Sequence, residues 1–288
     1  METTLIYRDG LELPLFATFP LLEDEAGLDS LRAYYASYVK LADELGAGLV
    51  LDTVTWRANA DWGERLGYDE AALANVNRRA VALLRELRRE ELPLLISGCV
   101  GPRGDGYVVG ETMPADEAER YHEPQIAVFA DEGVDLVSAL TLTYADEATG
   151  VVRAAARREV PVVISFTVET DGRLPSAQSL GEAIEQVDRD TGGAAAYFMV
   201  NCAHPTHFAH VLEDGAPWRE RIAGLRANAS TKSHAELDES DELDSGDPAD
   251  LGARYRALQD VLPRLAVVGG CCGTDERHVA AVARAVTR

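Results

Sequence analysis

The segment VPVVISFTVETDGRLPSAQSLGEAIEQVDRDTGGAAAYFMVNC, residues 160–202, decides the fold. It begins with an apolar, β-branched run at 160–168 and ends with a second apolar run at 195–202. Between them, residues 177–191 space their apolar side chains as a helix does. Nearly continuous apolar strands that alternate with helices are typical of a parallel sheet covered by helices. The segment therefore predicts a strand–helix–strand unit of an α/β protein.

The same alternation extends along the chain in both directions. Five further runs are predicted to be strands, at 48–55, 93–100, 134–141, 221–228 and 264–272. The other predicted helices cover 31–46, 69–91, 115–132, 144–158, 204–213, 248–262 and 275–287. Eight strand–helix units in about 250 residues make a (β/α)8 barrel.

The pattern is one strand short at the front, where residues 1–7 offer the only place for a first strand. We therefore predict an α/β (β/α)8 TIM barrel whose first strand is short or missing, with residues 1–288 as a single domain. A doubly wound open sheet is the alternative. It would normally carry a Gly-rich phosphate-binding loop after its first strand, and the sequence shows none.

The charge balance excludes several classes of partner. The 288 residues include 49 acidic and 27 basic side chains, which gives a formal net charge of −22. Such a surface repels phosphate backbones and anionic lipids, so we expect small-molecule partners rather than nucleic acid or membrane. The N-terminus lacks the layout of a signal peptide, and we expect a cytoplasmic protein. Only Lys40 and Lys232 are lysines, which fits GC-rich codons or a salt-rich cytoplasm.

Three cysteines stand at the ends of predicted strands. Cys202 ends the run at 195–202, and Cys271 with Cys272 end the run at 264–272. The C-terminal ends of barrel strands meet on one face, so these three thiols should converge. Three thiolates with a fourth position open to substrate are typical of a catalytic zinc site. We predict that Cys202, Cys271 and Cys272 bind zinc and are the catalytic residues; buried, inert cysteines are the alternative.

A zinc ion held by three thiolates favours chemistry on sulfur. Zinc keeps a bound thiol as a thiolate near neutral pH, so alkylation of a thiol is the natural reaction. Hydrolytic zinc sites more often use histidine and carboxylate ligands. His204 and His207 follow Cys202, but Pro205 suits the first turn of a helix, and we expect these histidines to begin that helix. Cys99 also ends a strand, and we expect it in the core or in the wall of the pocket.

The motifs NCAHP (201–205) and GGCCGT (269–274) resemble the zinc-binding signature of the homocysteine S-methyltransferase family, whose domain is a (β/α)8 barrel. The resemblance continues in SGCVGPRGDGY (97–107), SFTVETDGRLPSAQSL (165–180) and NASTKSHAELD (228–238). It implies that the substrate thiolate completes the zinc tetrahedron. It also implies methyl transfer from a small donor, such as S-methylmethionine, S-adenosylmethionine or a betaine, to homocysteine in methionine biosynthesis. Two alternatives are a methyltransferase for another thiol or selenol and a repurposed barrel with a structural zinc.

The resemblance also indicates substrate-binding residues. Asn228 matches a family residue near the metal, and Thr3 lies in ETTL (2–5), which matches the tail of the motif that holds the amino-acid end of homocysteine. The Asp-Gly-Gly that opens this motif has no match in the sequence. Leu140-Thr141 replaces the family's Glu-Thr, whose Glu binds the substrate amine.

Other side chains are candidates for completing the substrate pocket. Glu169 is the first candidate for the amine, and Glu147 is the alternative. Thr53, near the end of the predicted strand 48–55, and Trp56, directly after it, are candidate substrate contacts. Trp56 could pack on a sulfonium donor through cation–π attraction, and a core tryptophan is the competing interpretation.

Overall fold

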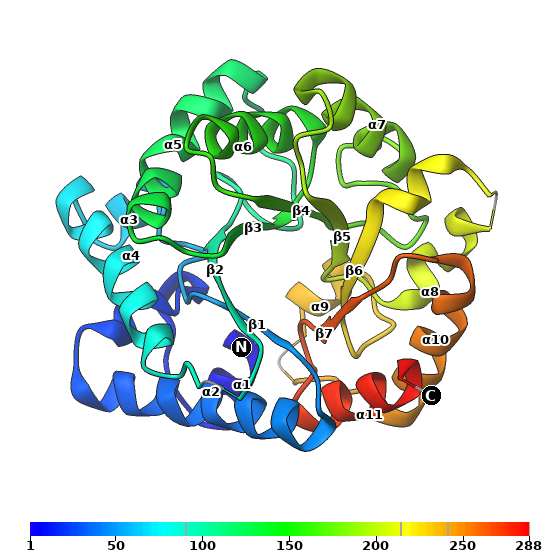
Figure 1. The fold of residues 1–288 in the computed structure, drawn as a ribbon, viewed down its shortest axis with the longest axis horizontal. Coiled ribbons are helices and arrows are strands. Elements are labelled where there is room, and N and C mark those ends of the chain that lie inside the picture. Colours follow the sequence, from blue (N-terminus) through cyan, green and yellow to red (C-terminus); the bar gives the residue numbers. More distant parts are fainter. Residues whose placement is uncertain (90, 214, 241, 288) are drawn as a thin grey trace.

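Seven parallel strands make one curled sheet with helices around its outside (Figure 1). The computed structural model describes residues 1–89, 91–213, 215–240 and 242–287. The strands pair in chain order, from β1 to β7. Their bounds are Leu49–Asp52, Leu94–Val100, Leu136–Leu142, Val162–Phe166, Tyr197–Asn201, Ile222–Ala227 and Val267–Gly270. All seven predicted strands are present, and the α/β TIM-barrel prediction is confirmed, with a barrel wall that is incomplete between β1 and β7.

The long helices follow the predicted alternation. They are α2 (Glu25–Leu45), α4 (Glu70–Arg85), α5 (Ala115–Asp131), α6 (Ala145–Arg157), α7 (Leu180–Thr191), α10 (Pro248–Val261) and α11 (Glu276–Val286). The predicted helix 69–91 is too long, because α4 ends at Arg85; residue 90 of that prediction lies outside the described residues. The predicted helix 204–213 is divided into α8 (Pro205–Phe208) and the 3-10 helix η3 (Ala209–Leu212).

The front of the chain is helical rather than extended. Residues 1–7 are the only candidate for a first strand, and most of them form α1 (Glu2–Tyr7), in which Thr3, Thr4 and Leu5 are buried. Side-chain contacts hold this helix, since the Thr18 hydroxyl donates to Glu2 at 2.9 Å and the Gly273 amide donates to the Thr3 hydroxyl at 3.3 Å. The prediction of a short or missing first strand is therefore confirmed, and no strand pairs with the free edge of β1 or β7 among the described residues.

Short elements were not predicted, because they contain too few residues to show a period. They are α3 (Ala60–Arg65), α9 (His234–Asp238), and the 3-10 helices η1 (Pro14–Phe16), η2 (Phe19–Leu22) and η4 (Pro217–Arg221). Within the part of the chain that the structure describes, no helix combines the length and the apolarity needed to cross a bilayer.

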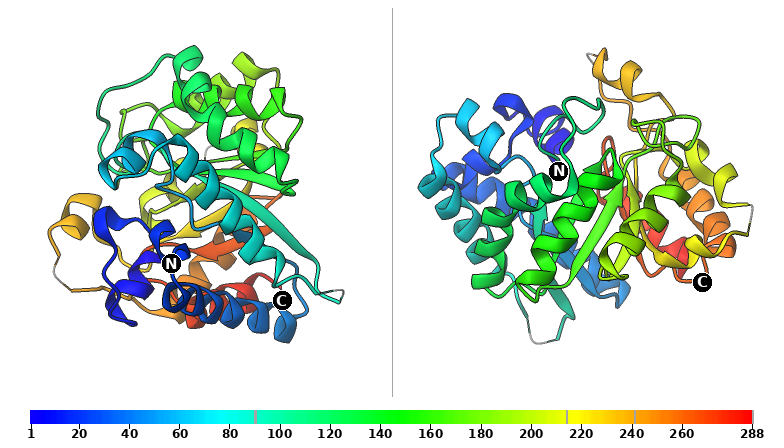
Figure 2. Two further views of the ribbon diagram at one scale, coloured as in Figure 1. Left: turned by 90° about the vertical axis from the view of Figure 1, so that its left-hand side faces the viewer. Right: turned by 90° about the horizontal axis from the view of Figure 1, so that it is seen from above.

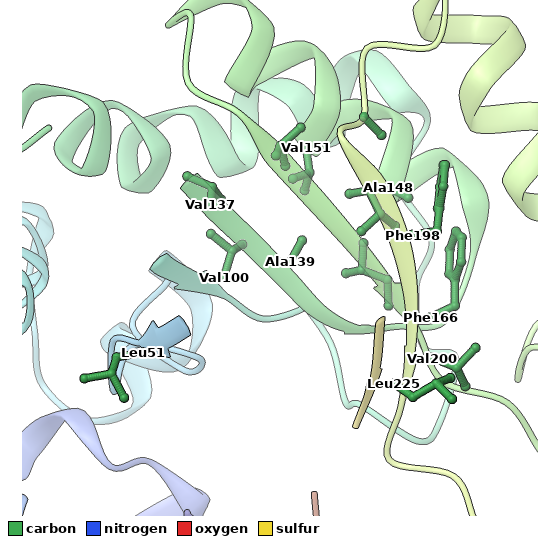
Figure 3. Close-up of a cluster of buried hydrophobic side chains, with 14 of the residues drawn as sticks. Leu51, Val100, Val137, Ala139, Ala148, Val151, Phe166, Phe198, Val200 and Leu225 are labelled. Carbon is green, nitrogen blue, oxygen red and sulfur yellow. The ribbon is translucent and has the colours of Figure 1, made fainter. Parts of the chain in front are cut away.

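Helices surround the sheet (Figure 2), and the main core lies between the strands and these helices, where Figure 3 shows part of its buried side chains. Val137 of β3 and Val151 of α6 are fully buried there. Small residues allow close packing: a Cβ on Gly98 would lie 2.4 Å from the Phe129 ring of α5. This packing fixes the strands, and the strands in turn fix the positions of the residues that follow their C-terminal ends.

Replacing Asp275 by alanine should destabilise the protein by about 2–4 kcal/mol. Asp275 caps α11 and is buried, with Arg277 at 2.7 Å, His278 at 2.9 Å and Arg8, directly after α1, at 3.2 Å. Burial alone would raise the Asp275 pKa, but the hydrogen bonds from Arg277 and His278 outweigh it and hold that pKa below its ordinary value. The stabilisation is thus present above about pH 4 and decreases as the pH falls toward the lowered pKa.

Urea unfolding at neutral pH and at about pH 3 measures this effect. The difference between the wild type and Asp275→Ala should shrink at pH 3, because the Asp275 carboxylate is then largely protonated in the unfolded protein but still ionised in the folded protein, so that unfolding takes up a proton. Asp69→Ala is the matched control, since Asp69 caps α4 through the Ala72 amide at 2.8 Å on an exposed surface and should cost only about 1 kcal/mol. Equal losses for the two variants would contradict the prediction.

Candidate metal centre

Three cysteine sulfurs lie together at the C-terminal ends of two strands. Cys202 directly follows β5, and Cys271 with Cys272 directly follow β7. The three Sγ atoms lie within 4.8 Å of one another. Cys202 and Cys271 are joined as a disulfide, and Cys272 Sγ lies 4.0 Å from Cys202 Sγ. The barrel topology thus gathers residues about 70 positions apart in the sequence, as the strand-end positions predicted.

Backbone hydrogen bonds fix both cysteine segments. The Cys202 amide donates to Arg226 O at 3.1 Å, and the Cys271 amide donates to Ala227 O at 2.8 Å. Both segments therefore bond β6, which lies between β5 and β7 in the sheet. Cys202 has a φ of 56°, a left-handed conformation that is uncommon for a residue with a side chain. Such conformations persist where the surroundings hold them, and they cluster at functional sites.

Asn228, which follows β6, bridges the two cysteine segments. Its Nδ2 donates to Cys202 O at 2.9 Å, and its Oδ1 accepts from the Cys272 amide at 3.0 Å. The side chain is only 2% exposed. Asn228 therefore contacts the backbone of two of the three cysteines, which places it beside the cluster.

The donor set fits a thiophilic metal ion. A tetrahedral zinc ion with Zn–S bonds of about 2.3 Å spaces its sulfur ligands roughly 3.8 Å apart, and the Cys202–Cys272 separation is close to this value. Among the described residues, the cysteines are the one group of three potential ligand side chains close enough to share an ion. All three can bind only when the Cys202–Cys271 pair is reduced. Burial raises the pKa of the Cys272 thiol, so a bound cation is needed to hold it as a thiolate at neutral pH.

Tyr107 and His234 lie beside the sulfur cluster and were not singled out from the sequence. The Tyr107 hydroxyl lies 3.5 Å from Cys272 Sγ, and its ring stacks on the His234 imidazole with centroids 4.0 Å apart. His234 Nε2 contacts Cys202 O at 2.8 Å, and its Nδ1 contacts Glu169 Oε1 at 3.1 Å. Both residues occur in the segments 97–107 and 228–238 that carry the family resemblance, which was the available signal.

Two of the proposed substrate-binding residues connect to this cluster. The Thr3 hydroxyl accepts from the Gly273 amide, directly after Cys272. Glu169 contacts His234 and keeps 36% of its side chain exposed, so the carboxylate can also reach a ligand. Their roles in substrate binding stay predictions.

Thr53 and Trp56 make hydrogen bonds within the protein, and their partners are not the three cysteines. The Thr53 hydroxyl is buried between the Thr55 hydroxyl at 2.6 Å and the Cys99 amide at 2.8 Å. Trp56 Nε1 donates to Leu140 O at 3.1 Å, which ties the loop after β1 to β3. Leu140 is itself buried. Substrate contact by Thr53 or Trp56 stays a prediction.

Glu147 and the two histidines have other partners. The Glu147 carboxylate is 1% exposed and bonds His122 at 2.9 Å and the Arg103 amide at 2.8 Å. Its Oε1 therefore anchors the loop after β2. His204 caps α8, as expected for a residue that begins a helix, and His207 bonds Thr231 O at 2.9 Å.

Comparison with known proteins places the chain in a family. The family model for homocysteine S-methyltransferase matches residues 1–286. The chain is 28% identical to the methionine synthase of Mycobacterium tuberculosis over 91% of its own length, but it spans only 22% of that longer protein. It is 24% identical to homocysteine S-methyltransferase 4 of Zea mays, with 84% of this chain and 76% of the maize protein covered.

The solved structures agree on the fold. The metallated form of the homocysteine methyltransferase MmuM from Escherichia coli superposes with a TM-score of 0.72 at 18% identity. The match covers 99% of this chain and 93% of MmuM, and the oxidized form gives a TM-score of 0.73. With the family model matched over nearly the whole sequence, this chain belongs to the homocysteine S-methyltransferase family.

Proposed function

We propose that this protein is a zinc-dependent S-methyltransferase that forms methionine from homocysteine and a small cationic methyl donor. The observation that carries the proposal is the convergence of the Cys202, Cys271 and Cys272 sulfurs within 4.8 Å at the C-terminal ends of β5 and β7. Zinc held by these residues would lower the pKa of a thiol substrate and keep it as a nucleophilic thiolate.

The reaction is a displacement at a methyl carbon. The homocysteine sulfur forms a bond to the methyl group as the bond between that carbon and the donor heteroatom breaks. A sulfonium or quaternary ammonium donor leaves as a neutral thioether or amine, and the thiol proton is released to solvent. The protein's part is to hold the two reactants in line, which can supply much of the rate acceleration.

The charges around the sulfur cluster favour a cationic donor. Asp238 lies near Asp105. Burial is the main cause that raises the Asp238 pKa, and the like charge of Asp105 raises it further. Asp105 accepts from the Tyr107 amide at 2.7 Å, and Glu169 contacts His234, which stacks on Tyr107. Asp105 and Asp238 thus lie near Tyr107, and Glu169 lies beside His234, in a chain with a net charge of −22. S-methylmethionine, S-adenosylmethionine and betaine all present a cation to such a site.

Zinc content and product formation test the proposal together. Reduced protein is loaded with zinc, its metal content is measured, and methionine formation from homocysteine is followed with each of the three donors in turn. We expect one zinc ion per chain and turnover with at least one donor. Zinc without turnover would point to another thiol or selenol acceptor, or to a repurposed barrel. Absence of zinc from reduced protein would overturn the proposal.

Replacing Glu169 by glutamine should raise the KM for homocysteine about tenfold and change kcat less. The Glu169 carboxylate is half-exposed beside the cluster, and an ion pair with the substrate ammonium contributes uniformly to ground-state and transition-state binding. Steady-state kinetics of the wild type and Glu169→Gln with homocysteine measure the change.

An acceptor without the amine supplies the control for this variant. Both proteins should methylate 4-mercaptobutanoate, which has the homocysteine skeleton but no ammonium group, with the same KM. If Glu169→Gln loses as much affinity for this acceptor as for homocysteine, Glu169 positions His234 instead of binding the amine.

We also propose that residues 1–288 act as one barrel domain and that the protein works in the cytoplasm. Three free thiolates require a reducing setting, which the cytoplasm provides. The methionine synthases that the chain matches are several times longer, so their complete activities are not assigned to it.

A further inference from the structure

In a metal centre that activates a substrate sulfur for methylation, the cysteine ligands could themselves be methylated. Cys202, Cys271 and Cys272 are sulfur nucleophiles at the place where the methyl donor must bind. A methyl group transferred to one of them would turn a thiolate ligand into a weakly binding thioether and inactivate the centre. Cys271 and Cys272 are both only partly buried, and Cys272 is the one whose sulfur lies beside a tyrosine hydroxyl.

Tyr107 is in a position to reduce the reactivity of the Cys272 sulfur. Its hydroxyl lies 3.5 Å from Cys272 Sγ, within the range for a hydrogen bond to sulfur. When the sulfur is a thiolate it has no proton to donate, so the phenol must be the donor. A hydrogen bond to a charged acceptor is stronger than a neutral one, and it withdraws electron density from the sulfur lone pair that would attack carbon.

The loop that carries Tyr107 is held at several points. The Arg103 amide donates to the buried Glu147 carboxylate at 2.8 Å, and Asn59 Nδ2 donates to Pro102 O at 3.2 Å. Arg57 and Trp62 both donate to Gly104 O, at 3.2 and 3.3 Å. These contacts come from the loop after β1, from α3 and from α6, so the approach of Tyr107 to Cys272 is built into the fold.

Gly106 and Tyr107, further along the same loop, are also held by close packing. A Cβ on Gly106 would lie 3.0 Å from Trp56 and from Thr141, so the backbone before Tyr107 fits against these side chains with no space to spare. The Tyr107 ring then stacks on His234 at an angle of 9°. The hydroxyl is therefore directed at Cys272 by packing on both sides of the residue.

We propose that Tyr107 is a positioning residue whose hydroxyl hydrogen-bonds the Cys272 thiolate and protects this ligand from methylation. The proposal rests on the proposed function, because it assumes that the three cysteines bind zinc. In the reaction that Tyr107 suppresses, Cys272 Sγ forms a bond to the methyl carbon of the donor, the donor's own bond to that carbon breaks, and a neutral thioether leaves. Tyr107 keeps its proton throughout.

Methyl iodide tests the proposal without any need for substrate recognition. Reduced, zinc-loaded wild type and Tyr107→Phe are treated with the reagent, and methylation of each cysteine is followed by peptide mass spectrometry. We expect Cys272 to be methylated roughly tenfold faster in Tyr107→Phe, because the lost hydrogen bond restores the nucleophilicity of its sulfur. The rates at Cys202 and Cys271 should change less than twofold. Tyr68→Phe, which removes a hydroxyl bonded to Glu23, is the matched control and should leave all three rates unchanged.

Cobalt substitution gives a second readout that a structural defect would not reproduce. Loss of a hydrogen bond to a thiolate raises the energy of its lone pair, so the sulfur-to-cobalt charge-transfer band of Tyr107→Phe should shift to lower energy than in the wild type and Tyr68→Phe. Equal Cys272 rates in wild type and Tyr107→Phe would overturn the proposal while leaving the proposed function intact. Equal acceleration at all three cysteines would also overturn it, because that result indicates a loosened loop. Reduced protein without zinc would overturn both proposals.

Discussion

Cys272→Ala should lose its zinc and lower turnover by about a thousandfold or more, because two thiolates cannot replace three in holding the ion. Cys272 Sγ lies 4.0 Å from Cys202 Sγ, and the Cys272 amide bonds Asn228, which also bonds Cys202 O. Alanine keeps these backbone contacts and removes only the sulfur. The loss should therefore appear in metal content and kcat, while the unfolding free energy of the metal-free protein stays within about 1 kcal/mol of the wild type.

Cys99→Ala is the matched control for this prediction. Cys99 is buried and free, and the three-sulfur group does not include it. Its amide and carbonyl bond Thr53 and Thr55 through the backbone, so alanine preserves these contacts. Removing its sulfur leaves a small cavity that should cost about 1 kcal/mol, and zinc should stay at one per chain. A Cys272→Ala protein with full zinc content and normal turnover would show that the metal centre lies elsewhere.

The order of the strands could be predicted because a parallel barrel leaves a strong signal in the sequence. Strands buried on both faces are continuous apolar runs, and each is separated from the next by a helix that must cover it. The convergence of the three cysteines then follows from topology alone, since β5 and β7 end on the same face with β6 between them. The main features of the candidate site therefore needed no knowledge of side-chain packing.

Tyr107 and His234 could not be predicted in the same way. Both lie beyond the strands, in a loop and in the short helix α9, and their positions depend on contacts from distant segments. Glu147 of α6 and Arg57 after β1 hold the Tyr107 loop in place. The sequence around neither residue indicates that it contacts this loop. The helical front of the chain was unpredictable for a similar reason, because Thr3 and Glu2 bond residues 273 and 18.

The conformation at the end of β3 is a further feature that only the structure reveals. Thr141 has a φ of 64°, which is rare for a β-branched residue and costs free energy. The side chain of Asn201 holds it there, accepting from the Thr141 amide at 2.9 Å and donating to the Thr141 hydroxyl at 2.8 Å. Asn201 also accepts from the Ser165 hydroxyl at 2.6 Å. One buried amide thus connects β3, β4 and β5 at the residue that precedes Cys202.

Asn201→Leu should accordingly destabilise the protein by about 3–5 kcal/mol and reduce its zinc affinity. Leucine has the same branching and the same number of heavy atoms but larger end groups, so the loss arises mainly from the Thr141 amide and two hydroxyls that stay buried without partners, next to a backbone that is already strained. Urea unfolding of the metal-free protein measures the stability, and competition with a chelator measures the affinity. Ser165→Ala removes only one of these hydrogen bonds and should cost about 1 kcal/mol with zinc affinity unchanged.

Comparing Asn201→Leu with Ser165→Ala distinguishes the loss of all the Asn201 hydrogen bonds from the loss of one of them. If the strained Thr141 backbone depends on Asn201, relieving the strain should recover part of the lost stability, and Thr141→Gly in the Asn201→Leu background provides that relief because glycine adopts a positive φ without cost. The double variant should be about 1 kcal/mol more stable than Asn201→Leu alone. A double variant that is less stable than Asn201→Leu would mean that the Thr141 side chain contributes more through packing than its backbone conformation costs, and that Asn201 is not the group that holds the strain.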